Sequence, residues 1–503
     1  MGVVIRQSFK ATIVSYAGAC IGAFTVIFLY PKCLTPEQIG LTRTLTEAAL
    51  LFSFFAQMGM SNVAIKFFPY FKDSDNHHNG FPFIITVFPL IGFSLFVIMF
   101  FLFENGIKSI FHDKSNLFNE YIIFVIPFTF FLVYSTIYET YASLLQRIVV
   151  PKLIKEVLIR ILTISIIILF FFKAINLNQF VFAFVSIYGI ASILNIFYIN
   201  SIQKINLKPK LDFIKNPLKR DMFTFTLFMV IAGVGSSISG RIDVFMIGNK
   251  ISLTGTGIFT IAFFIASFIE MPSRAIFQIT TPFASEALKN NDMVLIGSLY
   301  KRVAINQLII SGLLFLLIWA NADNIFRIMP NGHLYQSSKY VILFIGLAKV
   351  FDAATGINAT ILSYSKYYYY TLFFIFVLAI ITVTSNLILI PLYGIVGSAI
   401  ATAISIFLYN ATLVFFVNLK LMVQPFSINT LKVGFIILLI LVCNSLVHSN
   451  GNPYLDAIMR SSLIIILFLL AIYKFKVSDD INSFIVDFKN EHLKSLNVFR
   501  KKE

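Results

Sequence analysis

Ionisable side chains inside apolar stretches are the residues of this chain that could do chemistry. Burying a charge in hydrocarbon is costly unless the charge lines water or meets a partner, so each such residue is a candidate for function. Several of them form opposite-sign pairs three or four positions apart, which places both members on one face of a helix. These pairs are Arg43 with Glu47, Glu270 with Arg274, and Lys349 with Asp352. Their spacing predicts local ion pairs.

Three further ionisable residues in these stretches have no such local partner. Arg241 and Asp243 are two positions apart, so on a helix they point about 200° apart and need other partners. Glu139 has no cation within four positions on either side. Arginine offers a planar fork that fits phosphate oxygens, whereas a carboxylate can pair with a cation or bind a coupling ion. The cations are therefore candidate ligands for an anionic group.

The stretches that hold these residues predict a membrane protein built from helices. Hydrophobic residues make up 58% of the 503 positions and charged residues 12%, whereas a soluble domain carries about 25% charged residues. Apolar runs of about 20 residues, long enough to cross the hydrocarbon core of a bilayer, recur from end to end. They predict an all-α fold with about fourteen transmembrane helices. The expected helices are 9–30, 41–65, 81–103, 119–145, 153–172, 178–200, 221–247, 255–283, 302–320, 338–363, 367–390, 394–417, 430–448 and 454–473.

The positions of lysine and arginine predict the orientation. An even number of spans puts both termini on one side, and roughly two thirds of the 39 Lys and Arg residues lie in the loops and tail of that side. Because cytoplasmic loops are enriched in these cations, both termini are expected to be cytoplasmic. The basic linker 201–220 and the amphipathic, basic tail 474–503 are expected to lie on anionic lipid. The net charge of +16 is thereby explained, and nucleic acid is not an expected partner.

An internal repeat predicts two lobes. A shift of 217 residues lays 28–40 on 245–257, which puts Gly40 on Gly257, and a shift of 219 residues aligns a second long segment. Six helices return the chain to its starting side, so the repeats run parallel, related by an axis along the membrane normal. Two lobes around a central cavity predict alternating access. The expected parts are a first lobe at 1–200, a second lobe at 221–417, and two additional helices at 418–473.

Three local patterns, in this order along the chain, carry a resemblance to a known family. Leu34–Gly40 (LTPEQIG) follows the first helix, Ser239–Gly248 (SGRIDVFMIG) lies in the seventh, and Pro391–Thr402 (PLYGIVGSAIAT) joins the eleventh and twelfth. With these motifs and its topology over the whole chain, the sequence resembles the polysaccharide-biosynthesis flippases, the Wzx-type O-antigen translocases of the multidrug/oligosaccharidyl-lipid/polysaccharide (MOP) exporter superfamily. It departs from the family pattern at Ile39, where an aromatic residue is usual.

The resemblance implies a flippase of the bacterial inner membrane. Its substrate would be an undecaprenyl-pyrophosphate-linked oligosaccharide, a repeat unit of O-antigen, capsule or exopolysaccharide, moved from the cytoplasmic to the outer leaflet beside a polysaccharide polymerase and glycosyltransferases. The candidate ligands of the pyrophosphate are then Arg43, Arg241, Arg274 and Lys349. The candidates for coupling or ion pairing are Glu47, Glu139, Asp243, Glu270 and Asp352. The competing interpretation of all these residues is internal ion pairing that holds the lobes together.

Two other functions stay open at this point. A cation-coupled drug exporter of the same superfamily would need an acid in the first lobe to bind the coupling ion, and Glu47 or Glu139 could serve. A polytopic enzyme of polysaccharide assembly would need a large catalytic loop, and the longest expected loop between helices, 201–220, is short. We therefore predict no catalytic residue and no enzyme activity.

No cofactor or metal is expected. The cysteines Cys20, Cys33 and Cys443 are far apart with no CxxC pair, and no GxxxxGK[ST] phosphate-binding loop occurs. Asp73-Ser74-Asp75 matches the D-x-D of metal-dependent glycosyltransferases but lies in a short loop, and His77 and His78 beside it are expected to be solvated loop residues, not ligands.

Overall fold

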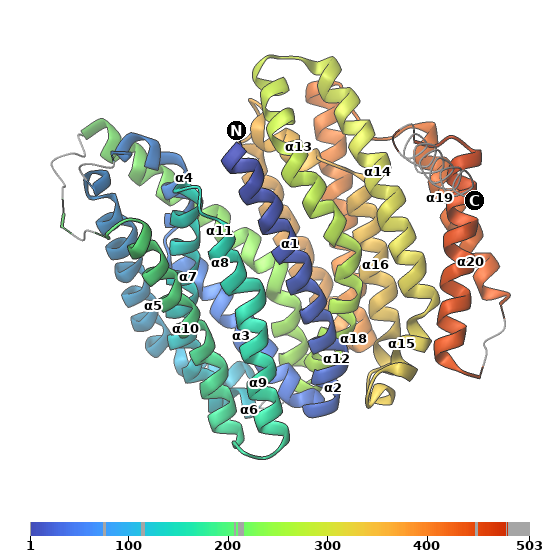
Figure 1. Cartoon of the computed structure of the whole chain (residues 1–503), viewed down its shortest axis with the longest axis horizontal. Coiled ribbons are helices and arrows are strands. Elements are labelled where there is room, and N and C mark those ends of the chain that lie inside the picture. Colours follow the sequence, from blue (N-terminus) through green and yellow to red (C-terminus); the bar gives the residue numbers. More distant parts are fainter. Residues whose placement is uncertain are drawn as a thin grey trace, which may run out of the picture. The chain divides into compact units, whose positions relative to one another are not determined.

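Helices account for all the regular structure in the residues that the computed structural model describes, which are 2–73, 77–111, 116–205, 208–209, 216–447, 451–478 and 480 (Figure 1). The all-α prediction is confirmed. Within these residues eleven helices are long and apolar enough to cross a membrane, or twelve if one bent pair counts as a single span. The basic tail falls almost entirely outside the described residues, as does the middle of the basic linker.

Contacts divide the chain into two compact units, Met1–Ile261 and Ala262–Glu503, and the chain passes from one to the other within α12 (Leu253–Ser267). The helices before α12 are α1 (Gly2–Phe24), α2 (Tyr30–Cys33), α3 (Pro36–Ala56), α4 (Met60–Phe71), α5 (Phe81–Phe111), α6 (Asn116–Tyr121), α7 (Val125–Leu144), α8 (Val149–Leu153), α9 (Ile159–Phe171), α10 (Leu177–Ile202) and α11 (Asn216–Lys250). Helix α11, expected to open the second lobe, packs in the first unit against α3 and α4. The two lobes themselves, which were inferred from the repeat, stay a prediction.

In the described residues, eight α-helices follow α12 in the second unit. They are α13 (Met271–Lys289), α14 (Met293–Ala320), α15 (Ala322–Ile328), α16 (Lys339–Ala354), α17 (Asn358–Tyr364), α18 (Tyr370–Leu421), α19 (Ile428–Ser445) and α20 (Pro453–Lys474), with a 3₁₀ turn at Phe268–Glu270 before α13. Helices α14, α19 and α20 enclose a core around Phe315, Ile437 and Phe468.

Two features account for most of the difference between the expected fourteen spans and the helices found. Helix α18 has 52 residues and a break at Gly394, where φ is 60° and ψ is −137°, so it corresponds to two of the expected spans. The segment formed by α8, a π-helical turn at Ile154–Leu158 and α9 corresponds to the expected span 153–172, and it is less apolar because it carries charges such as Glu156 and Arg160.

The Leu34–Gly40 motif starts α3 by a capping box. The Gln38 backbone N–H donates to Thr35 Oγ1 (3.3 Å), and the Thr35 N–H donates to Gln38 Oε1 (3.0 Å). Pro36 occupies the first helical turn, where its missing N–H costs nothing. The motif therefore fixes where α3 begins, and with it the side of the helix on which Arg43 and Glu47 lie.

Gly40 and Gly257, which the repeat aligns with each other, are in direct contact. A Cβ added to Gly40 would lie 1.9 Å from the Leu253 carbonyl oxygen, and one added to Gly257 would lie 1.8 Å from the Pro36 carbonyl oxygen. The contact is reciprocal. Gly40 lies against the residue four positions before Gly257, and Gly257 lies against the residue four positions before Gly40. Only residues without a side chain allow α3 and α12 to approach this closely.

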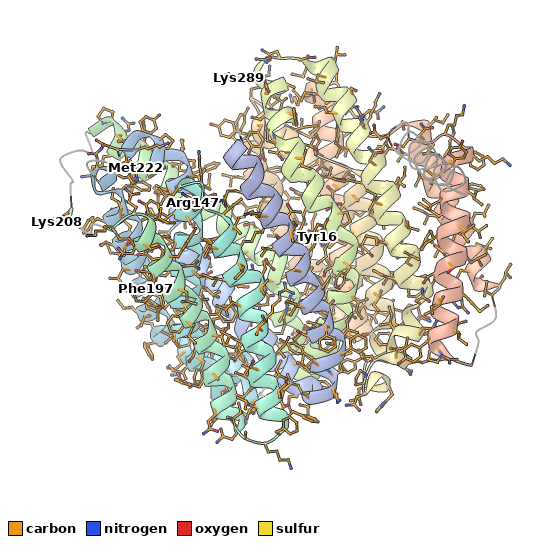
Figure 2. All side chains as sticks on the ribbon, viewed as in Figure 1. Tyr16, Arg147, Phe197, Lys208, Met222 and Lys289 are labelled. Atoms are coloured by element: carbon orange, nitrogen blue, oxygen red, sulfur yellow. The ribbon has the colours of Figure 1, made fainter. Side chains whose placement is uncertain are left out.

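Apolar side chains cover the outward faces of the helices, as a bilayer requires. Tyr16 on α1 and Phe197 on α10, both labelled in Figure 2, are more than half exposed. Such a surface would be unstable in water and is ordinary against lipid tails.

The expectation for His78 is wrong. Its side chain is buried, its Nδ1 accepts the Asp73 backbone N–H (3.0 Å), and its Nε2 contacts Gln203 Oε1 at 2.7 Å. The ring connects the loop before α5 to the end of α10, and the backbone at His78 is left-handed, with φ of 52°. Ser74 and Asp75 of the D-x-D match lie outside the described residues, as does the side chain of His77.

Candidate functional site

Glu47 is the centre of an ion-pair cluster in the first unit, which we call the Glu47 triad (Arg43, Glu47 and Arg241). The Arg43 guanidinium, one turn earlier on α3, lies 2.8 Å from Glu47 Oε1, and Arg241 Nη1 on α11 donates to Glu47 Oε2. Only 6% of the Glu47 side chain is exposed. The predicted local pair is present, and the partner that Arg241 needed is the same carboxylate.

The Glu47 triad carries an excess of one positive charge, since two guanidiniums share one carboxylate. The Nε atoms of Arg43 and Arg241 are buried and make no hydrogen bond in the described part of the chain. Arg241 also lies over the Phe54 ring, 6.0 Å from its centroid. Each guanidinium thus keeps a donor that an oxygen-rich anion could accept.

A second layer of polar groups lies beside the Glu47 triad, contributed by α2, α9 and α10. Tyr30 and Tyr188 lie within electrostatic range of Arg43 and Arg160. Arg160 is held by Glu156, one turn earlier, at 3.0 Å. Sequence reasoning did not single out these residues, although Glu156 and Arg160 are another pair at i,i+4 inside an expected span.

Two π-helical turns and two glycines position this layer. The turns are Thr25–Leu29, which ends immediately before Tyr30, and Ile154–Leu158, which ends just before Arg160. A Cβ on Gly22 would lie 1.4 Å from Arg160 Nη1, and one on Gly18 would lie 2.6 Å from the Glu156 carbonyl oxygen. The glycine face of α1 therefore leaves the space that Arg160 occupies. Single π turns of this kind are frequent at functional sites.

The structure also shows the surroundings of the other two candidate acids of the first unit, Glu139 and Asp243. Glu139 on α7 is bonded by Lys155 Nζ at 2.8 Å. This cation is 16 positions away, which is why no local partner was visible in the sequence. Asp243 on α11 is buried.

In the second unit Glu270 takes the corresponding central position, in what we call the Glu270 cluster (Glu270, Arg274 and Lys349). Arg274 Nε donates to Glu270 Oε1 at 3.1 Å, as the spacing predicted, and Lys349 Nζ on α16 bonds Glu270 Oε2. The Arg274 side chain is 70% exposed, whereas that of Lys349 is 17% exposed. Again one acid links two cations from different helices.

The predicted pair of Lys349 with Asp352 is replaced by a different arrangement. Lys349 acts on Asp352 electrostatically, but its ammonium bonds Glu270, while Asp352 Oδ1 accepts from Asn410 Nδ2 at 2.8 Å. Thr355 and Asn358 both donate to Asn410 Oδ1. These groups stand where α16 ends and α17 begins at a 50° bend, so the network satisfies polar groups at a broken span.

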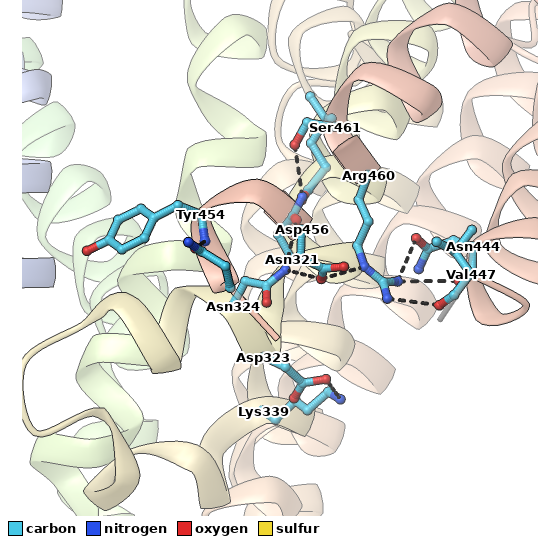
Figure 3. Close-up of polar contacts among 12 residues, drawn as sticks. Asn321, Asp323, Asn324, Lys339, Asn444, Val447, Tyr454, Asp456, Arg460 and Ser461 are labelled. Atoms are coloured by element: carbon cyan, nitrogen blue, oxygen red, sulfur yellow. Dashed lines mark hydrogen bonds and ion pairs between the residues drawn. The ribbon is translucent and has the colours of Figure 1, made fainter. Parts of the chain in front are cut away.

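A third ionic network, which sequence reasoning missed, joins α20 to its neighbours (Figure 3). Asp456 Oδ2 accepts from Arg460 Nε (2.8 Å) and from Asn324 Nδ2 (2.7 Å). The Arg460 guanidinium also donates to the Val447 carbonyl and to Asn444. This pair is balanced in charge, and its hydrogen bonds connect α20 to α15 and to the end of α19.

Comparisons with known proteins agree with this architecture. The search of curated proteins gives no match. Among solved structures, lipid II flippase MurJ in an inward closed conformation is similar with a TM-score of 0.70 at 15% identity, over 93% of this chain and 99% of that chain. A multidrug resistance MATE family transporter of the MOP superfamily is similar in its inward-facing conformation with a TM-score of 0.63 at 13% identity, over 82% of this chain and 98% of that chain. At these identities the likeness shows the fold. The family model described as "Polysaccharide biosynthesis protein" matches residues 5–288, more than half of the chain, and the chain belongs to this family.

Proposed function

We propose that this protein is a flippase that moves an undecaprenyl-pyrophosphate-linked oligosaccharide from the cytoplasmic to the outer leaflet of the bacterial inner membrane by alternating access. Membership of the polysaccharide biosynthesis family supports a saccharide substrate. The fold shared with a lipid II flippase supports a substrate on a lipid carrier. The repeat unit would be that of an O-antigen, a capsule or an exopolysaccharide, and a polymerase and glycosyltransferases would act beside the flippase.

The observation that carries this proposal is the Glu47 triad. A pyrophosphate brings at least two negative charges and several oxygen acceptors into the membrane, so it needs cations that are held in place before it arrives. Glu47 fixes two arginines from α3 and α11 within reach of one another and still leaves one positive charge and two Nε donors. We narrow the pyrophosphate ligands to Arg43 and Arg241, with Arg160, which acts on Tyr30 and Tyr188 together with Arg43, as a further candidate.

The Glu270 cluster receives a different role in this proposal. Its two cations face two acids, because Asp352 lies within electrostatic range of Lys349 and Glu270. The surplus that would attract an anion is therefore absent from this group of four. We assign Glu270 and Lys349 to holding α13 and α16 together, or to coupling, and do not make them primary pyrophosphate ligands.

A cation-coupled drug exporter is the second candidate, favoured by the fold shared with multidrug MATE transporters. That function needs a carboxylate free to bind the coupling ion. In the first unit Glu47 and Glu139 are each bonded by arginine or lysine, which disfavours them for this task. The exporter would require those ion pairs to open.

The test is a deletion strain complemented with the wild-type gene or with Arg241→Ala. We expect loss of surface polysaccharide and accumulation of the lipid-linked saccharide in the cytoplasmic leaflet when the gene is absent, and no change in drug sensitivity. Normal surface polysaccharide in the deletion strain, together with drug hypersensitivity, would establish the exporter instead.

A further inference from the structure

A large cavity in the first unit, separate from the Glu47 triad, has the shape and chemistry of a lipid site. It has a volume of about 1150 Å³ and lies among α3, α4, α5 and the beginning of α11. Typical small-molecule sites measure roughly 300–1,000 Å³, so the space is ample for hydrocarbon chains. We call it the α5–α11 cavity.

A break in the helical path makes the α5–α11 cavity. Between α3 and α4 the backbone turns at Met58 and Gly59, both with φ above 50°. On α5 a glycine allows a close approach to this break, because a Cβ on Gly92 would lie 2.3 Å from the Ala56 carbonyl oxygen. Helix α5 therefore packs closely against the end of α3 at Gly92, while the backbone between α3 and α4 turns away from it at Met58. Met58 and Gly92 both line the space that results.

The walls of the α5–α11 cavity are apolar and partly exposed at the surface of the first unit. Among its described lining residues the polar or charged side chains are Lys219, Arg220 and Thr226. Wall residues such as Met99 and Leu227 are about half exposed, so the cavity is not sealed by protein. An apolar space that opens onto hydrocarbon gains contacts when a lipid chain fills it, because a void leaves its walls without partner atoms.

Two cations mark one end of the α5–α11 cavity. Lys219 and Arg220 stand in the first turn of α11, next to Met222, which is labelled in Figure 2. Both are exposed, and neither forms an ion pair with a described residue. Cations at a helix N-terminus oppose the helix dipole, so an anion beside them would relieve an unfavourable arrangement. An apolar cavity with a cationic end complements an anionic lipid.

We propose that the α5–α11 cavity binds one anionic phospholipid, with its chains along α5 and α11 and its phosphate at Lys219 and Arg220. A site that opens to the bilayer is filled by the abundant matching lipid, by mass action, before a scarce carrier lipid. The bound lipid would lie between α11, which carries Arg241, and the helices α3 and α5, of which α3 carries Glu47. This inference does not depend on the proposed flippase activity.

Native mass spectrometry of the full chain, extracted in mild detergent from its own membranes, tests the proposal. We compare the wild type with Lys219→Gln/Arg220→Gln, with Leu227→Trp to fill the cavity, and with the control Lys204→Gln/Lys476→Gln, two exposed lysines outside it. Each lysine or arginine near an anionic lipid is worth ~1 kcal/mol, so the first variant is expected to retain the lipid about tenfold less or worse. The tryptophan variant should also lose it, and the control should not.

The mass of the retained molecule and its response to the variants decide the outcome. One anionic phospholipid, lost in both cavity variants and kept in the control, supports the proposal. Equal retention in all proteins overturns it, as does a retained molecule with the mass of a polyprenyl phosphate or of a zwitterionic lipid. Gel filtration identifies any variant that fails to fold, and the remaining cavity variant then decides the result.

Discussion

The two units of this chain each contain a carboxylate that links two cations from different helices, and the two clusters differ in what surrounds them. In the Glu47 triad both cations are arginines, the acid is almost fully buried, and one positive charge is left over. In the Glu270 cluster the cations are an exposed arginine and a lysine, and the nearby Asp352 balances the charge.

This difference distinguishes ion pairs that only hold helices together from ion pairs that position cations to bind an anion. A balanced group with many partners, such as Asp456 with Arg460, gains nothing further from an added anion. An unbalanced group keeps its cations aligned and still attracts negative charge. Because desolvated charges interact strongly, a surplus of one positive charge in a span attracts an anion strongly.

Arg241→Ala should have the largest effect on transport. Removing Arg241 leaves Glu47 paired with Arg43 but takes away the surplus positive charge and one guanidinium of the proposed anion site. Loss of a buried, charged contact to the substrate costs about 2–5 kcal/mol, so flipping of lipid-linked saccharide in proteoliposomes should fall about 30-fold or more. Arg241→Lys should restore part of the activity, because the charge returns without the planar fork. Activity within twofold of wild type would remove the distinction between the two clusters.

Gly40→Ala should have the next largest effect, because it would displace α3 from α12 and lower the stability of the protein. The added Cβ would overlap the Leu253 carbonyl oxygen, which is backbone and cannot rotate away. Overpacking of this kind costs about 1–3 kcal/mol, so the thermal unfolding temperature in detergent should fall by several degrees. The control is Gly240→Ala on α11, where nothing lies within 4 Å of the added Cβ. An equal change in both variants would refute the role of this contact.

Arg274→Ala should have a small effect on transport. This side chain is mostly exposed, and Glu270 keeps its bond to Lys349 when Arg274 is removed. Exposed pairs are worth about 0–1 kcal/mol, so flipping should change by less than about fivefold. A loss as large as that of Arg241→Ala would make the Glu270 cluster part of the anion site.

Asp480, which lies outside the spans, forms a pH-dependent ion pair with Arg302 of α14. This pair gives a reference for the contribution of an exposed ion pair in the same chain. Hydrogen bonds from Arg302, and secondarily from Asn306, hold the pKa of Asp480 below its ordinary value of 3.8. The lowered pKa means that the contact stabilises this end of the chain above about pH 4 and is lost as the pH falls through the folded-state pKa. Hydrogen exchange around Val477 and Ser478 should therefore increase below that pH.

The matched control for this effect is Asp480→Asn, which should show fast exchange at every pH. High salt should mimic part of the loss, because an exposed pair is screened. Exchange that does not depend on pH in the wild type would show that this pair contributes nothing.

Much of the architecture follows from the sequence because the bilayer imposes simple rules. Helix lengths match the hydrocarbon thickness. Thr35 and Gln38 form a capping box that is local in sequence and predicts the start of α3. Pairs at i,i+4, such as Arg43 with Glu47, are predictable for the same reason. The break at Gly394 also coincides with the start of the expected helix 394–417.

The partners that come from distant helices could not be predicted. Arg241 and Glu47 are 194 positions apart, and Lys155 reaches Glu139 from the next helix. Lys349 could choose between Asp352 on its own helix and Glu270 on another, and only the packing of α16 against the turn before α13 decides. Glu156 and Arg160 were missed although their i,i+4 spacing is a local signal. The closeness of Arg160 to Tyr30 and Tyr188 on other helices could not be predicted from the sequence.

Binding of geranylgeranyl pyrophosphate to the purified protein in nanodiscs tests most directly whether the Glu47 triad is the anion site. We expect Arg43→Gln/Arg241→Gln to weaken binding about 100-fold relative to wild type, and Arg274→Gln/Lys349→Gln to weaken it less than about fivefold. Geranylgeranyl monophosphate should bind more weakly to the wild type and should discriminate less between the variants. Equal losses in the two double variants, or a greater loss in the second, would contradict the assignment.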